Sequence, residues 1–189
     1  MSQRLPARVG DAVAAIETPA LVLDLDAFER NLDAMANATR AIRLRPHAKA
    51  HKCPDIARLQ TARGAVGVCC QKTDEAAAFV EAGIADVLVT NEVVAPAKIA
   101  RLAECARVAT IGVLVDDADN VTALSKAAAI AGVSLDVYVE INQYRHESLR
   151  CDARRAGARV GAADRRIGGA PISRFACVPR WRAASSCAR

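Results

Sequence analysis

Five apolar, β-branched runs recur between residues 43 and 141, and stretches of helical periodicity separate them. The starts of these runs lie roughly 20 to 26 residues apart, a spacing typical of βα units and of a parallel sheet. Pro54 and Pro96 stand where first helical turns would begin. The predicted strands are residues 43–49, 65–70, 86–90, 109–115 and 135–141. Two predicted helical faces consist of Ile99, Leu102, Ala103 and Ala106, and of Val121, Leu124, Ala128 and Ala131.

Before these units, the segment ALVLDL (residues 20–25) predicts a buried strand because it is rich in branched apolar residues. Asp26 is placed to cap a following helix, with Glu29 at the reciprocal position of a capping box. Residues at helical spacing then define the apolar face of this helix: Phe28, Leu32, Met35, Thr39 and Ile42.

An open doubly wound sheet and a (β/α)₈ barrel both fit this alternation. Every predicted strand carries polar residues at its C-terminal end, as expected where all strands open onto the mouth of a barrel. In an open sheet, such residues gather at one switch point, and no G-x-G-x-x-G motif follows any strand. The pattern therefore favours a partial barrel with about five of eight strands. The residues at the strand ends are Lys49, Gln71, Lys72, Thr90, Asn91, Asp116, Asp117, Glu140 and Asn142.

The alternation stops after residue 142. Residues 143–189 show no βα pattern, and 151–189 contain no Leu but many Ala, Arg, Gly and Pro. We therefore divide the chain into a barrel portion, 1–142, and an aberrant Arg/Ala-rich tail, 143–189. The tail is interpreted as out of frame or otherwise replaced, because GC-rich codons in a shifted frame encode these residues. An authentic disordered basic tail is the alternative.

Composition narrows the location and the partners. The net charge is +5, but residues 151–189 hold nine Arg, no Lys and two Asp, so residues 1–150 carry about −2. The basic charge is therefore poor evidence for a nucleic-acid surface on the folded part. The seven cysteines include no C-x-x-C pair, and we find no signal peptide or long apolar stretch. These features predict a cytoplasmic protein that binds neither nucleic acid nor membrane.

The segment RPHAKAHK (residues 45–52) carries the strongest chemical signal. As a strand it would place Arg45, His47, Lys49 and His51 on one face. Lys49, facing inward at the barrel mouth, is then a candidate Schiff-base amine, because burial and neighbouring positive charge lower the pKa of a lysine. The alternative is an ordinary solvated lysine at a strand–loop junction.

Other motifs predict less. His47, His51 and Cys53 could bind a metal, but the spacing matches no recognised cage, and we assign no metal ligand. The adjacent Cys69 and Cys70 are predicted to face opposite ways as buried small residues. Asp116 and Asp117 could be paired carboxylates, but a helix-capping role is favoured. The Arg-rich tail could bind RNA, but it lacks an aromatic stacking platform apart from Trp181.

Several segments, in order, resemble the N-terminal half of the D-threonine aldolase and 3-hydroxy-D-aspartate aldolase group. This group belongs with the D-serine dehydratase-like proteins and the alanine racemase N-terminal barrel superfamily. The resemblance covers about residues 15–142, and its most specific segment is R-P-H-A-K-x-H-K. The matching segments are TPALVLDLDAFERNL (18–32), RLRPHAKAHK (43–52), GAVGVCCQK (64–72), GIADVLVTNEVV (83–94) and LDVYVEI (135–141).

The resemblance implies pyridoxal 5′-phosphate (PLP) as cofactor, with Lys49 as the lysine that binds its aldehyde. It implies that His47, Gln71, Thr90 and Asn91 line the cofactor pocket, and that residues 20–25 belong with a second, β-rich domain. The implied reaction is cleavage of a D-3-hydroxy amino acid, D-threonine or 3-hydroxy-D-aspartate, to glycine and an aldehyde. Full-length members also use a divalent metal and are commonly homodimers.

The chain departs from this family after residue 142. NQYRHESLRC replaces a glycine-containing R-C-G segment, and Arg150-Cys151 is its faint echo. The phosphate-binding loops and the C-terminal metal pair have no counterpart in 143–189. We therefore expect this chain alone to be inactive or nearly so. D-Serine dehydration, racemisation and non-catalytic PLP binding are the alternative functions.

Overall fold

A parallel sheet forms the centre of the computed structural model, which describes residues 6–141 and, for backbone only, 172–179. Its five described strands lie side by side in chain order. The order never reverses, as expected for a barrel wall and not for a doubly wound sheet. The strands are β1 (Val68–Cys70), β2 (Asp86–Glu92), β3 (Thr110–Val115), β4 (Leu135–Ile141) and β5 (Ile172–Pro179).

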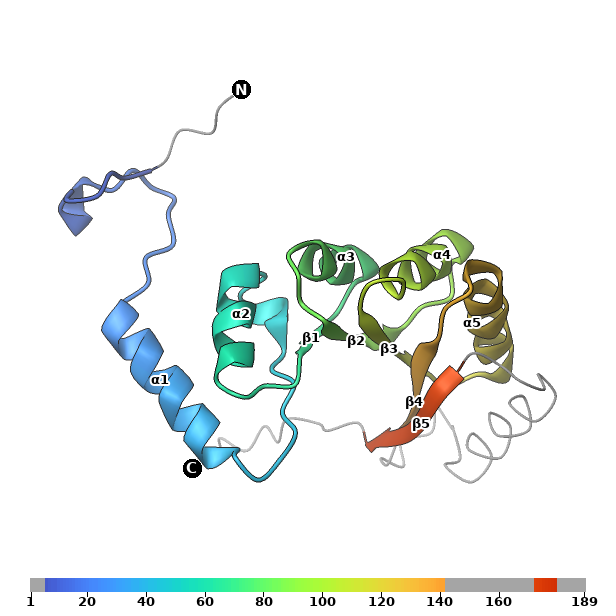
Figure 1. Ribbon diagram of the computed structural model, residues 1–189. Coiled ribbons are helices and arrows are strands. Elements are labelled where there is room, and N and C mark those ends of the chain that lie inside the picture. Colours follow the sequence, from blue (N-terminus) through green and yellow to red (C-terminus); the bar gives the residue numbers. More distant parts are fainter. Residues whose placement is uncertain (1–5, 142–171, 180–189) are drawn as a thin grey trace, which may run out of the picture.

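Four helices cover one face of this sheet, as Figure 1 shows. They are α2 (Pro54–Ala62), α3 (Thr73–Glu81), α4 (Pro96–Cys105) and α5 (Ala118–Ala131). Pro54 and Pro96 each occupy the first helical turn, as predicted, because proline lacks the N–H that this turn leaves unpaired. Asp117 caps α5 by accepting hydrogen bonds from the backbone N–H groups of Asp119 and Asn120. The helical faces predicted around Leu102 and Leu124 are buried except at their ends, where Ala106 and Ala131 are half-buried.

The strands alternate between two apolar clusters. Residues such as Cys70, Val87 and Val113 pack beneath the helices, while Cys69, Leu88 and Leu114 form a smaller cluster on the opposite, inner face with Tyr138. The prediction that Cys69 and Cys70 face opposite ways and are buried is therefore confirmed. Burial raises the pKa of the Cys69 thiol to about 11 and that of Cys70 to about 12, so both remain protonated near neutral pH.

Two glycines allow close approach on this sheet. A Cβ on Gly67 would lie 2.2 Å from the backbone oxygen of Asp86, which opens β2. A Cβ on Gly112 would lie 2.8 Å from the end of the Leu88 side chain. The backbone obstacle at Gly67 cannot move aside as a side chain can.

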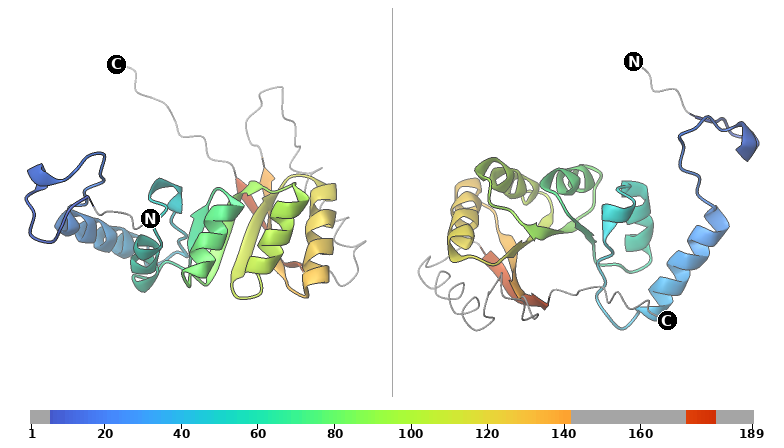
Figure 2. Two further views of the ribbon diagram at one scale, coloured as in Figure 1. Left: turned by 90° about the horizontal axis from the view of Figure 1, so that it is seen from above. Right: turned by 180° about the vertical axis from the view of Figure 1, so that it is seen from behind.

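The N-terminal region differs from the prediction. Helix α1 (Leu25–Ala38) is capped by Asp24, which accepts from the N–H of Ala27, and not by Asp26. Residues 20–24 form no strand, and Leu21, Val22 and Leu23 are exposed. A strand needs a hydrogen-bonded neighbour, and no described strand lies beside this segment. Figure 2 shows α1 standing beyond α2 at the end of the sheet.

Two further expectations about strands are wrong. Residues 43–49 do not form a regular strand: a single parallel bridge joins His47 to Cys69, and the chain then turns into the short helix η2 (Ala48–Ala50). In the tail, β5 pairs in parallel with β4, although no strand was expected after residue 142. The interpretation of the tail as out of frame stays a prediction. No helix in the described ranges is long and apolar enough to cross a membrane.

Candidate active site at the strand ends

The candidate site lies at the C-terminal ends of the first segments of the sheet. His47 ends the segment that runs beside β1, Gln71 follows β1, and Thr90 lies within β2. The bridge pairs His47 with Cys69, which in turn pairs with Leu88, so these residues form one row across the sheet. Thr90, two residues beyond Leu88, comes to the same inner face as His47.

A chain of hydrogen bonds fixes the His47 ring. The Thr90 hydroxyl donates to the carbonyl oxygen of Cys70 at 3.0 Å, and Thr90 Oγ1 lies 2.8 Å from His47 Nε2. His47 Nδ1 accepts the backbone N–H of Lys49 at 3.3 Å. Because the Thr90 proton is already used and Nδ1 is an acceptor, the proton of a neutral ring belongs on Nε2. The ring is therefore fixed in one tautomer and one orientation.

His47 is neutral near physiological pH. Burial lowers its pKa below the usual value, and the charge of Lys49 lowers it further, while Glu75 opposes the shift. The backbone N–H of Lys49 is bonded to this ring, so the residue that carries the amine is tied to the imidazole through its main chain. The site thus places a neutral imidazole beside a primary amine.

Lys49 lies in η2 and is exposed. The predicted shared face of Arg45, His47, Lys49 and His51 does not form, because the chain turns at η2 before the alternation can continue. Arg45 instead pairs with Asp86, with 2.7 Å from Nε to Oδ1 and 2.8 Å from Nη2 to Oδ2. The contact between Lys49 and its basic neighbours is reduced to His47.

The remaining predicted residues differ in their placement. Gln71 donates from Nε2 to the Thr90 carbonyl oxygen at 3.4 Å, so it belongs to the same cluster. Asn91 is exposed, because the pairing of β2 with β3 shifts register between Val89 and Glu92. The structure therefore brings together His47, Gln71 and Thr90 but leaves Asn91 outside their contacts.

Lys52 and Glu75 join this cluster, although sequence reasoning assigned them no role there. Glu75 Oε2 accepts the backbone N–H groups of Gln71 at 2.9 Å and Lys72 at 3.3 Å, and Oε1 lies 3.3 Å from Lys52 Nζ. Glu75 occupies the third position of α3, where an acidic residue commonly accepts from the capping residue. This capping position of Glu75 could be predicted from the local sequence, whereas its ion pair with Lys52, which is distant in the chain, could not.

His51 turns away from the other basic residues. Its Nδ1 accepts the Cys53 N–H at 3.1 Å, and its ring lies edge-on to Phe79 with centroids 6.4 Å apart. Burial lowers the pKa of His51, and the neighbouring Cys53 and Gln60 groups oppose this shift. Across residues 6–141, no group of three His, Cys, Asp or Glu side chains could hold a metal ion.

The acidic pair after β3 divides its roles. Asp117 caps α5, in agreement with the capping interpretation. Burial raises the pKa of Asp116, and the charges of Glu92 and Asp117 raise it further.

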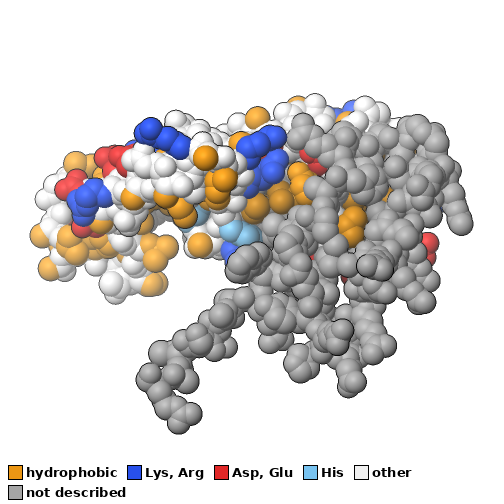
Figure 3. All heavy atoms as spheres, turned by 90° about the horizontal axis from the view of Figure 1, so that it is seen from below, with side chains coloured by type: hydrophobic (Ala, Val, Ile, Leu, Met, Phe, Trp, Pro, Cys, Tyr) orange, Lys and Arg blue, Asp and Glu red, His pale blue; other side chains and the backbone are white. Residues whose placement is uncertain are grey.

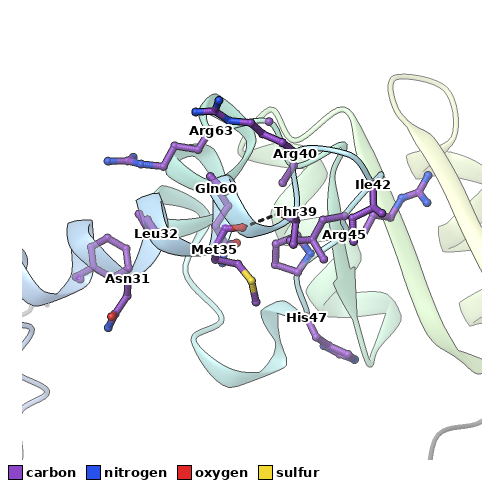
Figure 4. Close-up of a pocket in the computed structure, with 16 residues that line it drawn as sticks. Asn31, Leu32, Met35, Thr39, Arg40, Ile42, Arg45, His47, Gln60 and Arg63 are labelled. Carbon is purple, nitrogen blue, oxygen red and sulfur yellow. Dashed lines mark hydrogen bonds between the residues drawn. The ribbon is translucent and has the colours of Figure 1, made fainter.

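A cavity of about 580 Å³ lies between α1 and the chain leading to His47. Figure 4 shows Leu32 and Met35 of α1 on one side and Ile42 on the other, and Gln60 of α2 also lines the cavity. Lys49 does not line this cavity, so we do not take the cavity as the site of the reacting amine. Viewed from below, histidine side chains are visible at the molecular surface (Figure 3).

Comparisons with known proteins bear on this site. Residues 23–163 match the family model described as alanine racemase, N-terminal domain. The chain is 56% identical over 139 residues to D-threonine aldolase from an Arthrobacter species, covering 72% of this chain and 37% of that protein. It is 50% identical over 142 residues to 3-hydroxy-D-aspartate aldolase from Paracoccus denitrificans, covering 73% of this chain and 37% of that protein.

A solved structure extends the likeness to the fold. D-Threonine aldolase from Filomicrobium marinum superposes with a TM-score of 0.81 at 49% identity, covering 93% of this chain and 47% of that chain. The chain thus spans 37% of the length of the two curated relatives and 47% of the solved one.

Proposed function

Because the chain belongs to the alanine racemase N-terminal domain family, we propose that it is the lysine-bearing part of a PLP-dependent aldolase. The proposed substrates are D-3-hydroxy amino acids, D-threonine or 3-hydroxy-D-aspartate, and the products are glycine and an aldehyde. Identity of 56% and 50% to two aldolases of this type supports the assignment. Since the chain spans 37% of their length, the whole activity is proposed for a protein that includes the remainder.

The described residues include a group that suits the aldehyde of PLP. Lys49 offers an exposed primary amine, which can condense with an aldehyde, two residues after a half-buried neutral imidazole that is bonded to its backbone, and this observation carries the proposal. Lys49 would hold the aldehyde, with His47, Thr90 and Gln71 forming the adjacent polar wall. Asn91 stays a proposed cofactor residue whose exposure would have to change on binding. When bound, PLP withdraws electrons from the bond that breaks at the substrate Cα.

The protein groups supply orientation. Thr90 holds the Nε2 side of the His47 ring through the Cys70 carbonyl, and the Lys49 N–H occupies Nδ1. The backbone of the reacting lysine is thereby tied to the imidazole beside it. Gln71 braces the Thr90 backbone, so movement of β2 relative to β1 is limited. Such rigid support keeps a reacting group within the narrow tolerance that catalysis needs.

Several finer assignments belong to the same proposal. Full-length relatives of this type would add a divalent metal, for which we assign no described residue. We further propose a cytoplasmic protein without nucleic-acid or membrane partners, and a homodimer for the full-length form. The described cysteines Cys53, Cys69, Cys70 and Cys105 are all free thiols, which agrees with a reducing compartment.

Reductive trapping tests the assignment of Lys49. Condensation of a lysine amine with the PLP aldehyde releases one water, and borohydride then supplies a hydride that leaves a stable secondary amine. Cleavage before Asp residues yields peptide 33–54, whose lysines are Lys49 and Lys52, and peptide 55–73, which carries Lys72. Mass spectrometry should place the pyridoxyl group on Lys49. A label confined to other lysines would refute the proposal.

A chimera tests the reaction. Residues 15–142 would replace the matching segment of the Arthrobacter D-threonine aldolase, with Lys49→Ala as the inactive control. We expect glycine and acetaldehyde from D-threonine with the first protein and none with the second. Trapping at Lys49 without turnover in the chimera would favour non-catalytic PLP binding instead.

A further inference from the structure

Two lysines, Lys49 and Lys52, lie in the turn after His47, and either could offer its amine to an aldehyde. Lys49 and Lys52 are three residues apart, and both are exposed. Their surroundings differ, because Lys52 forms an ion pair with Glu75 whereas Lys49 pairs with no carboxylate of the described residues. The structure therefore distinguishes a free amine from an engaged one.

Glu75 is well placed to make this distinction. Its side chain is 12% exposed and is fixed by the backbone N–H groups of Gln71 and Lys72, so only its Oε1 faces Lys52. Burial alone would raise the pKa of Glu75, but these hydrogen bonds and the charge of Lys52 lower it overall. The carboxylate is therefore ionised near neutral pH and held in one orientation.

The backbone of Lys52 shows that the turn is constrained. Lys52 has φ of +50°, a conformation that residues other than glycine rarely adopt. Its N–H donates to the Ala48 carbonyl oxygen at 2.7 Å, which closes the turn around Lys49. Strained backbone persists where the surrounding contacts hold it, and such positions cluster at functional sites. The Glu75 contact is one that holds this end, as His47 holds the other.

We propose that Glu75 is a positioning residue that, by engaging Lys52, fixes the turn presenting Lys49 and keeps Lys52 from competing for the aldehyde. This inference rests on the proposed function, in which Lys49 is the reacting amine. Glu75 contacts neither the side-chain amine of Lys49 nor a reacting atom, so its effect on Lys49 passes through Lys52.

Site-resolved labelling of the chain with PLP and borohydride tests the competition. In Glu75→Gln the carboxamide can still accept the two N–H groups but loses the charge that attracts Lys52. Labelling of Lys52 should rise about two- to fivefold, the range that an exposed ion pair supports. The share on Lys49 should fall correspondingly. Glu81→Gln, at the exposed opposite end of α3, is the matched control and should leave both rates unchanged.

A second pair of variants tests positioning without competition and without altering Glu75. Lys52→Arg keeps a cation for Glu75 but has no amine that can condense with the aldehyde. Lys52→Met has neither the cation nor the amine. We expect Lys49 to be labelled at the wild-type rate in the first variant and about two- to fivefold more slowly in the second. This difference would persist even if Glu75→Gln failed to fold.

The outcomes separate the two proposals. If the wild-type label is on Lys49 but the Glu75→Gln distribution is unchanged and the two Lys52 variants behave alike, the positioning role is overturned and Lys49 stands. If the wild-type chain carries its label on Lys52 or Lys72 instead, the assignment of Lys49 fails and the role of Glu75 fails with it.

Discussion

The ion pair between Arg45 and Asp86 is the contact whose loss should most weaken the lysine-bearing segment. In the sheet, β1 lies between the Arg45 segment and β2, so the pair spans β1 on the inner face. The two side chains are only 17% and 19% exposed and make two charge-assisted hydrogen bonds. This pairing raises the pKa of Arg45, through its hydrogen bond to Asp86 above all, so its guanidinium remains charged at any working pH.

Asp86→Asn preserves the shape but leaves a partly buried guanidinium without its counter-charge. Hydrogen bonds to charged groups contribute roughly 1.5–3 kcal/mol, and breaking a fully buried pair costs about 3–5 kcal/mol. Because about a fifth of each side chain reaches solvent and asparagine can retain one acceptor, we expect a loss of about 2 kcal/mol. Glu104→Gln removes the exposed partner of Arg107 and should cost less than about 0.5 kcal/mol.

Urea denaturation followed by circular dichroism gives both free energies, and hydrogen exchange of residues 44–52 reports the segment itself. Asp86→Asn should speed exchange there more than in the central strands, because the segment is then held by the backbone hydrogen bonds of Leu44 and Pro46 and by the contact between His47 and Thr90. The reasoning is wrong if Asp86→Asn costs no more than Glu104→Gln, or if Arg45→Met and Asp86→Asn show additive losses in the double variant.

Two further predictions follow from burial and backbone geometry. The pKa values of His47 and His51 are lowered on folding, so the stability they contribute is present above pH 6.5 and is lost as the pH falls below that value. The free energy of unfolding should therefore fall as the pH drops below 6.5, and His47→Gln should flatten this slope, whereas an unchanged slope would contradict the assignment. Gly67→Ala should cost about 3 kcal/mol or more because its Cβ meets backbone, and Gly112→Ala less because side-chain ends can move. Equal urea midpoints for the two glycine variants would count against this ranking.

The regular part of the fold was predictable because each element carries its own signal. The runs around Val68, Val87, Val113 and Val137 are apolar on both faces, as strands buried beneath helices must be. Pro54 and Pro96 mark helix starts by the absence of an N–H group. These are local properties. Alternation of strands and helices fits an open doubly wound sheet as well, and it was the polar residues at every strand end that favoured the barrel.

The segment leading to Lys49 was mispredicted for a physical reason. Pro46 has no N–H for a ladder, and the His47 ring accepts the Lys49 N–H, which diverts the chain into η2. Alternation of basic and small residues could not reveal either effect. The strand predicted at residues 20–24 is wrong for a different reason: their apolar composition is typical of a strand, but no described strand pairs with them.

The assembly of the site depends on register more than on residue type. His47 and Thr90 are 43 residues apart, and they meet only because the His47–Cys69–Leu88 row sets Thr90 on the inner face. A slip of one residue between β1 and β2 would turn Thr90 toward the helices and remove the partner that fixes the His47 tautomer. The register shift of β2 against β3 begins directly after Val89, so it leaves the pairing with β1 intact while releasing Asn91 to the surface. The irregularity in β2 thus leaves Thr90, which holds the imidazole, on the inner face and places Asn91 at the surface.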